Sequence, residues 1–321
     1  MKKYNLLVTG VGAIIGYGIV RSLRKCRYDV NIVGMDVYPD AAGQHWCDTF
    51  LQASWASAPD YCDFVADIID RYRIDLVFPG LEPEIYRLCS TKQPFPGDFR
   101  KLILNNRELI EISRDKWHLY DYLHQHAIRT IKTYIAGDFD WIVQELKLPF
   151  LLKPRRSSAS KGIVHIECKE DFHYWKNKLG DNFMVQEIIA DDEHEYTVGV
   201  FGLADGTFSQ SIAFARKLSR EGSTVKARTV HIDELDEEVR RLTALLKPVG
   251  PTNYQFRHHE GAYLLLEVNP RFSSSLSLRT AFGFNEPEMC IDYFGENIPP
   301  KPAIITEGTA VRYIEDIVNR I

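Results

Sequence analysis

The chain is organised around PTNYQFRHHEGAYLLLEVNPRFSS, residues 251–274. This stretch predicts two strands joined by a tight turn, because side chains alternate with the period of two that a strand imposes. The first strand alternates polar with apolar residues: Asn253, Gln255 and Arg257 with Tyr254 and Phe256. The second alternates two sets of three: Leu265, Glu267 and Asn269 with Leu264, Leu266 and Val268. A three-residue loop at 260–262, with Gly261 at positive φ, would place Gln255 opposite Glu267.

Oxygen-bearing side chains would then converge on one face of the hairpin: Gln255, Glu267 and Asn269. Carboxylate and amide oxygens are hard ligands, which suit Mg²⁺ that also carries substrate phosphate oxygens. Arg271 follows directly, after Asn269-Pro270 has ended the strand, and could stabilise charge on a transferring phosphoryl group. The hairpin alone leaves a second interpretation open, an amphipathic pair of strands with one solvated face.

Composition sets the bounds of the other expectations. A chain of 321 residues with 45% apolar side chains predicts two or three domains with a sizeable core. The net charge of -5 argues against nucleic acid as the main partner. Six cysteines without a CxxC pair indicate reduced thiols in the cytoplasm rather than disulfides or a zinc site. Glycines and cations interrupt the apolar N-terminal run, so it predicts neither a signal peptide nor a membrane span.

The N-terminal region has the pattern of a doubly wound α/β sheet. Strand 4–9 is followed by a turn with Gly10, Gly12 and Gly16, a helix over 16–25, and a strand that ends at Asp36. The spacing GxGxxxG and an acid at Asp36 leave open both a dinucleotide site and a purely structural turn. A helix at 60–73 and a strand at 74–80 continue the alternation, and Glu82 and Glu84 follow at the carboxyl end of that strand. Ligands bind there in open α/β sheets, although solvated loop acids fit the pattern too.

The middle of the chain predicts a second unit. A last strand over 101–106 places the domain boundary near residue 105, and Ser113 or Asp115 caps a helix over 115–126. Strand 150–154 carries Lys153 and leads into a small, basic loop, 155–162, which is either a mobile tip or a phosphate cover. A strand at 183–189, a strand pair around Gly206 and a helix at 234–247 complete the pattern before the hairpin.

Together these motifs resemble the ATP-grasp superfamily, in the branch of carbamoyl-phosphate synthetase domains and amino-acid ligases. The most specific of them is LLLEVNPRFSS preceded by PTNYQF, and the resemblance covers nearly the whole chain. It implies an α/β plus α+β fold, in which a Rossmann-like pre-ATP-grasp domain precedes a two-part ATP-grasp fold. The implied domains are 1–105, the small subdomain with its linker helix and phosphate loop at 106–190, and the central and C-terminal subdomain at 191–321.

The resemblance also implies a role for individual residues. The ATP-binding positions match Lys116, Lys153, Ser158, Gln186, Glu187, Ile189, Glu195 and Lys217, where 185–189 is the adenine-contacting hinge and Glu195 binds the ribose. The magnesium ligands match Gln255, Glu267 and Asn269, which would hold two Mg²⁺ or Mn²⁺ ions, and Arg271 and Lys153 match the catalytic cations. Carbamoyl-phosphate synthetases often carry a second arginine where this chain has Ser274, which speaks against carbamoyl-phosphate formation.

The expected activity is an ATP-dependent carboxylate–amine ligase that works through an acyl phosphate. Its partners would be small-molecule carboxylates and amines, with no nucleic acid and no membrane, and a homodimer is the default assembly. Substrate contacts are expected from Glu82, Ser274 and Arg279, since the fork of an arginine suits a carboxylate. Two other classes stay open: an NAD-dependent oxidoreductase built on the glycine turn and Asp36, and a nucleotide-binding module without catalysis.

Overall fold

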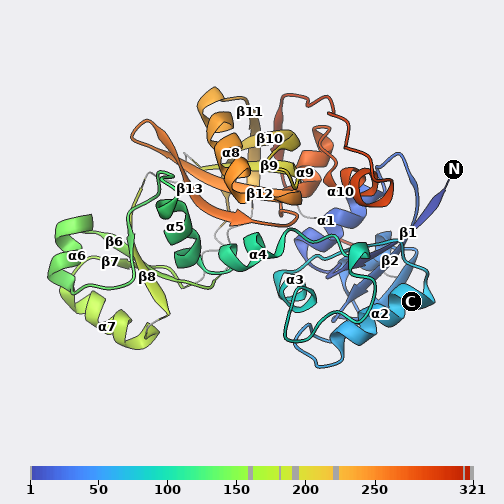
Figure 1. The fold of residues 1–321 in the computed structure, drawn as a ribbon, viewed down its shortest axis with the longest axis horizontal. Coiled ribbons are helices and arrows are strands. Elements are labelled where there is room, and N and C mark those ends of the chain that lie inside the picture. The colour runs from blue at the N-terminus through green and yellow to red at the C-terminus, as the bar shows by residue number, and fades with distance from the viewer. Residues whose placement is uncertain are drawn as a thin grey trace.

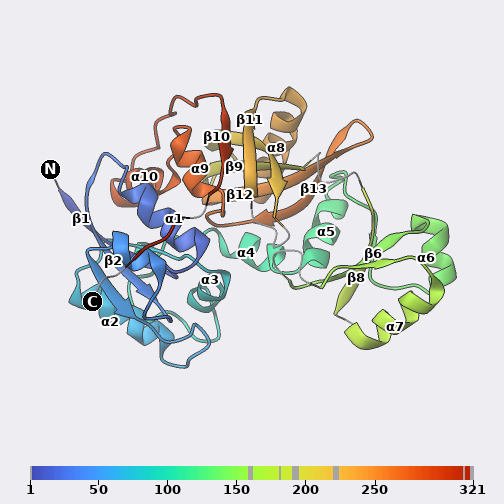
Figure 2. The same cartoon turned by 180° about the vertical axis from the view of Figure 1, so that it is seen from behind.

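The protein has three sheets arranged along its longest axis, in a computed structural model that describes residues 2–157, 162–180, 182–189, 195–219, 224–313 and 315–318. Figure 1 shows the N-terminal unit at one end, the largest sheet in the middle and a small sheet with two helices projecting at the other end. Figure 2 shows the same order from behind. The prediction of an α/β unit followed by two α+β units is confirmed.

The N-terminal sheet is entirely parallel, with the strand order β3-β2-β1-β4. Its strands are β1 (Lys3–Thr9), β2 (Asp29–Asp36), β3 (Thr49–Gln52) and β4 (Leu76–Phe78). Its helices are α1 (Ile14–Leu23), α2 (Tyr61–Arg71) and α3 (Glu82–Leu88), with short 3-10 turns at Ala42–Trp46 and Phe99–Lys101. The strand expected over 101–106 is reduced to one parallel bridge between Val77 and Leu102.

The glycine turn after β1 is tightly packed. Gly10 has a φ of +60°, and a Cβ on Gly16 would lie 2.0 Å from the carbonyl oxygen of Gly10, so only glycine fits there. The backbone N–H of Gly12 donates to Asp36 Oδ2 at 2.7 Å. Asp36, the acid that could have bound a ribose, therefore stabilises the glycine turn.

The small sheet is antiparallel, with the strand order β5-β8-β6-β7. Its elements are β5 (Thr133–Tyr134), α6 (Phe139–Leu146), β6 (Phe150–Pro154), β7 (Val164–Ile166), α7 (Lys169–Leu179) and β8 (Phe183–Glu187). It has a core of its own, in which Phe139, Phe150 and Phe172 pack together. The predicted strand at 183–189 ends two residues early.

The third sheet has six antiparallel strands in the order β13-β12-β9-β10-β11-β14. They are β9 (Glu195–Leu203), β10 (Phe208–Leu218), β11 (Thr224–Val230), β12 (Val249–His259), β13 (Ala262–Asn269) and β14 (Thr309–Val311). Its helices are α8 (Asp233–Leu246), α9 (Leu276–Ala281) and α10 (Glu286–Cys290), followed by a π-helical turn at Ile291–Gly295. None of the helices in the described ranges is long and apolar enough to cross a membrane.

Two cores connect parts of the chain that the sequence pattern assigns to different domains. Helices α4 (Arg107–Ser113) and α5 (Lys116–Gln125) pack into the core of the third sheet, where Leu109 and Leu119 lie with Val198 and Tyr254. Figure 1 shows α4 against this sheet and α5 between this sheet and the small one. The other face of the third sheet shares a core with the N-terminal unit. The expected segment 106–190 is divided between two packing units, because α4 and α5 pack on the third sheet whereas the small sheet has its own core.

The hairpin β12–β13 has the predicted pairing of Gln255 with Glu267, but it reaches that pairing differently. The loop has two residues, Glu260 and Gly261, both at positive φ, and the register then shifts by one at an extra residue, Leu266. Such a bulge turns the following side chains to the other face. The prediction that Leu265 shares a face with Glu267 is therefore wrong, because Leu265 and Val268 pack together in one core.

Candidate active site

A pocket of about 290 Å³ lies where the N-terminal unit, α4 and α5, and the end of β13 meet. The pocket is lined by five residues that the sequence singled out: Glu82, Lys116, Glu267, Asn269 and Arg271. They come from α3, from the start of α5, and from β13 and the segment after it, which are far apart in sequence. The fold therefore gathers predicted phosphate, metal and substrate groups around one space.

Lys116 is positioned by the residue before it. Asp115 caps α5 by accepting from the Trp117 N–H at 3.0 Å. Its carboxylate also accepts from Arg155 Nε at 3.1 Å and from Arg155 Nη2 at 2.8 Å, which ties α5 to the end of β6. Lys116 Nζ donates to the carbonyl oxygen of Ser157, and burial lowers the pKa of Lys116. The ammonium is thus held at the start of the phosphate loop, partly stripped of water.

Lys153 lies on β6 and reaches across to β8. Its Nζ donates to Gln186 Oε1 at 2.6 Å, and Gln186 Nε2 in turn donates to Thr133 Oγ1 at 2.9 Å. Burial, followed by the nearby cations Arg257 and Lys116, lowers the pKa of Lys153 to about 8. A triphosphate placed between these cations would restore the charge that their mutual repulsion disfavours.

The predicted hinge at the end of β8 is anchored by packing and by a hydrogen bond. Ile189 is buried with Ile131 and Leu264 in a small apolar core. The carboxylate of Glu187 accepts from the backbone N–H of Lys132 at 2.9 Å and so joins β8 to the chain before β5. Ser158 and the rest of 158–161 lie outside the described residues, as does 190–194.

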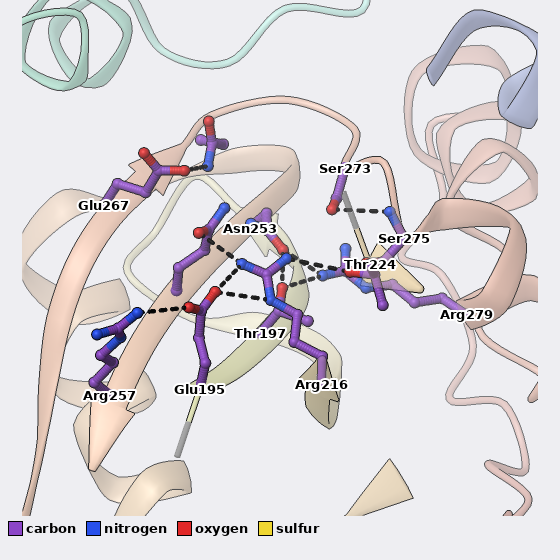
Figure 3. A network of polar contacts seen from close by, with 12 residues as sticks. Glu195, Thr197, Arg216, Thr224, Asn253, Arg257, Glu267, Ser273, Ser275 and Arg279 are labelled. Carbon is purple, nitrogen blue, oxygen red and sulfur yellow. Dashed lines mark hydrogen bonds and ion pairs between the residues drawn. The ribbon is translucent and has the colours of Figure 1, made fainter. Parts of the chain in front are cut away.

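Glu195 lies in a buried network on β9, β10 and β12 (Figure 3). Arg216 donates to Glu195 Oε1 through Nε at 3.1 Å and Nη2 at 2.6 Å, and the same Nη2 donates to Gln255 Oε1 at 2.7 Å. Arg257 reaches the other oxygen of Glu195 at 3.4 Å. Two guanidinium groups thus hold the acid that was expected to bind the ribose, and Lys217 is exposed one residue beyond Arg216.

The expected metal ligands divide into two environments. Glu267 Oε1 accepts from Asn269 Nδ2 at 3.0 Å, and both residues line the pocket. Gln255 does not line it, and its oxygen faces Arg216. No group of three or more His, Cys, Asp or Glu side chains that could hold a metal ion occurs within the described ranges. Glu267 and Asn269 have the oxygen chemistry for Mg²⁺, which would then take most of its other ligands from phosphates and water.

Arg271 faces the N-terminal unit. Its Nε donates to Glu82 Oε1 at 3.0 Å, and its Nη2 donates to Asn269 Oδ1 at 2.9 Å. Asn269 therefore links the proposed metal position to the guanidinium. Both charged groups of the ion pair line the pocket, so an incoming substrate would meet a cation and an anion side by side.

Arg279 and Ser274, the other expected substrate contacts, do not line this pocket. Arg279 is fully buried, and its Nη1 lies 3.3 Å from Glu286 Oε1. Figure 3 shows its guanidinium directed toward Asn253 and Thr197, to both of which it donates. Gly199 makes room for it, because a Cβ there would lie 2.4 Å from the guanidinium carbon. Arg279 thus connects α9 with β9, β12 and α10.

The sequence analysis does not identify the residues that hold the predicted site residues in place. No buried partner is predicted for Arg216, and no bond is predicted between Asp115 and Arg155. One signal was present for Arg216, since Ile212, Phe214 and Arg216 alternate along β10 and the first two are buried. A cation that ends an apolar row predicts a buried partner. Nothing local to 115 or 155 indicates their pairing.

The fold is the ATP-grasp architecture, in which an N-terminal α/β domain precedes an ATP-grasp domain. Within it, residues 180–317 match a family described as "ATP-grasp in the biosynthetic pathway with Ter operon". Residues 6–97 match a family described as "PylC-like, N-terminal domain". No curated protein sequence matches the chain.

Solved structures share the fold at low sequence identity. N5-carboxyaminoimidazole synthetase from Staphylococcus aureus, complexed with ADP, has a TM-score of 0.73 at 15% identity, covering 95% of this chain and 81% of that one. A biotin carboxylase complex from Campylobacter jejuni has the same TM-score and identity, with coverages of 95% and 74%. The biotin carboxylase domain dimer of 2-oxoglutarate carboxylase from Hydrogenobacter thermophilus, with MgADP, has a TM-score of 0.72 at 13% identity, with coverages of 95% and 73%.

Proposed function

We propose that the protein is an ATP-dependent carboxylate–amine ligase that works through an acyl phosphate. The observation that carries this proposal is the pocket in which Lys116, Glu267, Asn269 and Arg271 meet Glu82 of the N-terminal unit. Phosphate-binding cations and hard oxygen ligands on one side, and a carboxylate on the other, suit a pocket that binds both a nucleotide and an amine. The ADP and MgADP complexes of structures with this fold support ATP and magnesium as its cofactors.

The reaction has two steps. An oxygen of the substrate carboxylate attacks the γ-phosphorus of ATP, so that a P–O bond forms and ADP leaves. The amine then attacks the carbonyl carbon of the acyl phosphate, loses a proton and expels phosphate, which leaves an amide. Catalysis is mainly positioning and charge neutralisation, and no side chain need form a covalent bond.

The residues take the following roles in this proposal. Lys116 and Lys153 bind phosphate oxygens, and Arg271 stabilises charge on the phosphoryl group in transit. Glu267 and Asn269 hold magnesium, which neutralises phosphate charge when bound. Glu82 accepts hydrogen bonds from the ammonium form of the amine substrate, and the ammonium loses a proton before the amine attacks. The hinge at Glu187 and Ile189 contacts the adenine, backed by the buried side chains of Ile131 and Leu264.

The alternatives have less support. In an NAD-dependent oxidoreductase the N–H of Gly12 and the carboxylate of Asp36 would serve the cofactor, but here they bind each other at 2.7 Å. A module without catalysis would have no need for Arg271 and Lys116 in one pocket with Glu267. A homodimer and a cytoplasmic location remain part of the proposal, supported by the dimeric biotin carboxylase domain and by six unpaired cysteines.

Hydroxylamine trapping tests the proposal without knowledge of the amine. The protein is incubated with Mg-ATP, hydroxylamine and a panel of amino acids, hydroxy acids and sugar acids. A substrate carboxylate is expected to yield its hydroxamate together with an equal amount of ADP, because hydroxylamine intercepts an acyl phosphate. ADP formation without hydroxamate for every acid that stimulates it would contradict the acyl-phosphate route. Absence of ADP with every acid would favour the module without catalysis.

A further inference from the structure

A second pocket of about 240 Å³ lies between α1, α9 and the segment that includes the end of β14. Figure 2 shows the last part of the chain running past α1. Three cations line the pocket, Arg21, Lys25 and Arg312, and hydroxyl groups come from Tyr17, Ser277 and Thr280. The proposed nucleotide pocket shares no lining residue with it.

The pocket has a charge imbalance. No carboxylate is among the described residues that line it. Arg21 lies in the last turn of α1 and Lys25 lies two residues past its end, where the helix dipole favours cations and so explains these two charges. Arg312 has no such explanation, because it comes from the far end of the sequence and adds a third positive charge to the same space.

Arg312 is also incompletely bonded. Its Nη2 donates to the carbonyl oxygen of Ser274, whereas its Nε is buried without a hydrogen-bond partner in the part of the chain that the structure describes. Burial lowers the pKa of Arg312, and the proximity of Arg21 lowers it further. Two guanidinium groups that repel each other around a hollow are stabilised by an anion between them.

We propose that this pocket binds a small molecule through a dianionic phosphate group. Two arginines and a lysine match the charge of a phosphate ester, and arginine forks bind its oxygens in pairs. The hydroxyls of Tyr17 on α1 and of Ser277 and Thr280 on α9 supply further polar groups, and Thr280 Oγ1 also bonds Ser22 Oγ at 2.8 Å. The volume suits a phosphate with a small organic body, whereas drug-sized ligands usually occupy about 300–1,000 Å³. The site is distinct from the phosphate positions of the nucleotide.

Calorimetry with inorganic phosphate tests this site independently of turnover. The full chain is first saturated with Mg²⁺ and a non-hydrolysable ATP analogue, so that the nucleotide pocket is filled. Phosphate is then expected to bind saturably, at one ion per chain, with an affinity that falls as salt rises. Arg21→Ala and Arg312→Ala should each weaken binding about tenfold to a hundredfold, the range typical of a lost charged hydrogen bond.

Matched variants keep the test decisive if Arg312→Ala fails to fold. Arg21 and Lys25 are exposed, so Arg21→Ala and Lys25→Ala leave the core intact. Arg24→Ala is the control, since it removes a cation from the same end of α1 but from outside the pocket, where Arg24 pairs with Asp48 at 2.9 Å. Absence of saturable binding at millimolar phosphate, or equal losses in Arg24→Ala and Arg21→Ala, would overturn the proposal. Tighter binding of citrate than of phosphate would overturn its phosphate class.

Discussion

Arg271 and Glu82, 189 positions apart in the sequence, form an ion pair across the candidate active site, with Arg271 Nε 3.0 Å from Glu82 Oε1. The pair joins the segment after β13 to the first turn of α3. It brings the cation proposed for the phosphoryl group next to the acid proposed for the amine. The N-terminal unit and the third sheet are therefore in contact through the two side chains to which the proposed reaction assigns roles.

The role of Glu82 can be measured. Glu82→Gln keeps the size of the side chain but removes the charge that would hold an ammonium. We expect the KM of the amine substrate to rise about tenfold or more, while the KM of ATP changes little. Glu111→Gln, at an exposed position of α4, is the control. If the KM of ATP rises and that of the amine does not, Glu82 serves only to orient Arg271.

The carboxylate of Glu267 is the clearest test of the metal position. Glu267→Gln keeps the hydrogen bond geometry but removes the only carboxylate on β13 that lines the pocket. Turnover should fall by about two orders of magnitude or more, because phosphate charge is no longer balanced. Steady-state rates at saturating Mg²⁺ check this, with Glu260→Gln in the exposed turn of the same hairpin as control. Near-normal turnover would remove Glu267 from the site.

The lowered pKa of Lys153 predicts a pH dependence. Lys153 carries its charge below a pKa of about 8 and loses it above, so ATP binding should weaken as pH rises through that value. Since kcat/KM reports the free enzyme, kcat/KM for ATP should fall above about pH 8, whereas kcat should fall less because bound phosphates favour the ammonium. Lys153→Arg stays charged and should abolish that fall. An unchanged profile in Lys153→Arg would assign the titration to another group.

Much of the fold and of the hairpin can be predicted from the sequence, because strand alternation and the hairpin motif are local. The order of the units and the pairing of Gln255 with Glu267 follow from spacings within single stretches. The bulge at Leu266 did not, since a three-residue loop and a two-residue turn plus one extra residue give the same pairing further along. The two arrangements are distinguished only by packing: Leu264 packs with Ile131 on one face, and Leu265 packs in the same core as Val268 on the other.

The rest depends on contacts between distant segments. Arg279 follows the phosphate-binding motif closely, so the sequence suggested a substrate contact. Its burial arises because Gly199 leaves a space on β9 and Glu286 supplies a charge from α10. Similarly, the apolar faces of α4 and α5 are visible in the sequence, but not which sheet they cover.

Arg279 should therefore affect stability more than binding. Arg279→Met leaves Glu286 buried without its partner, which should lower the free energy of unfolding by about 3–5 kcal/mol. Denaturant unfolding measures this, and the double variant Arg279→Met with Glu286→Leu should recover a large part of the loss. A rise in the KM of the carboxylate substrate in Arg279→Lys, with unchanged stability, would instead restore the substrate role that the sequence suggested.

The distribution of the cores determines which parts of the protein can move as rigid bodies. Side chains of β1 and α1 interdigitate with those of β9, β10 and the segment after β13, so separating these units would expose a continuous apolar interface to water. The small sheet is different, since its buried phenylalanines pack within one unit. A nucleotide that enters would thus be enclosed by rotation of the small sheet, which carries Lys153 and Gln186. The N-terminal unit and the third sheet, which carry Glu82, Glu267 and Arg271, would stay fixed relative to each other.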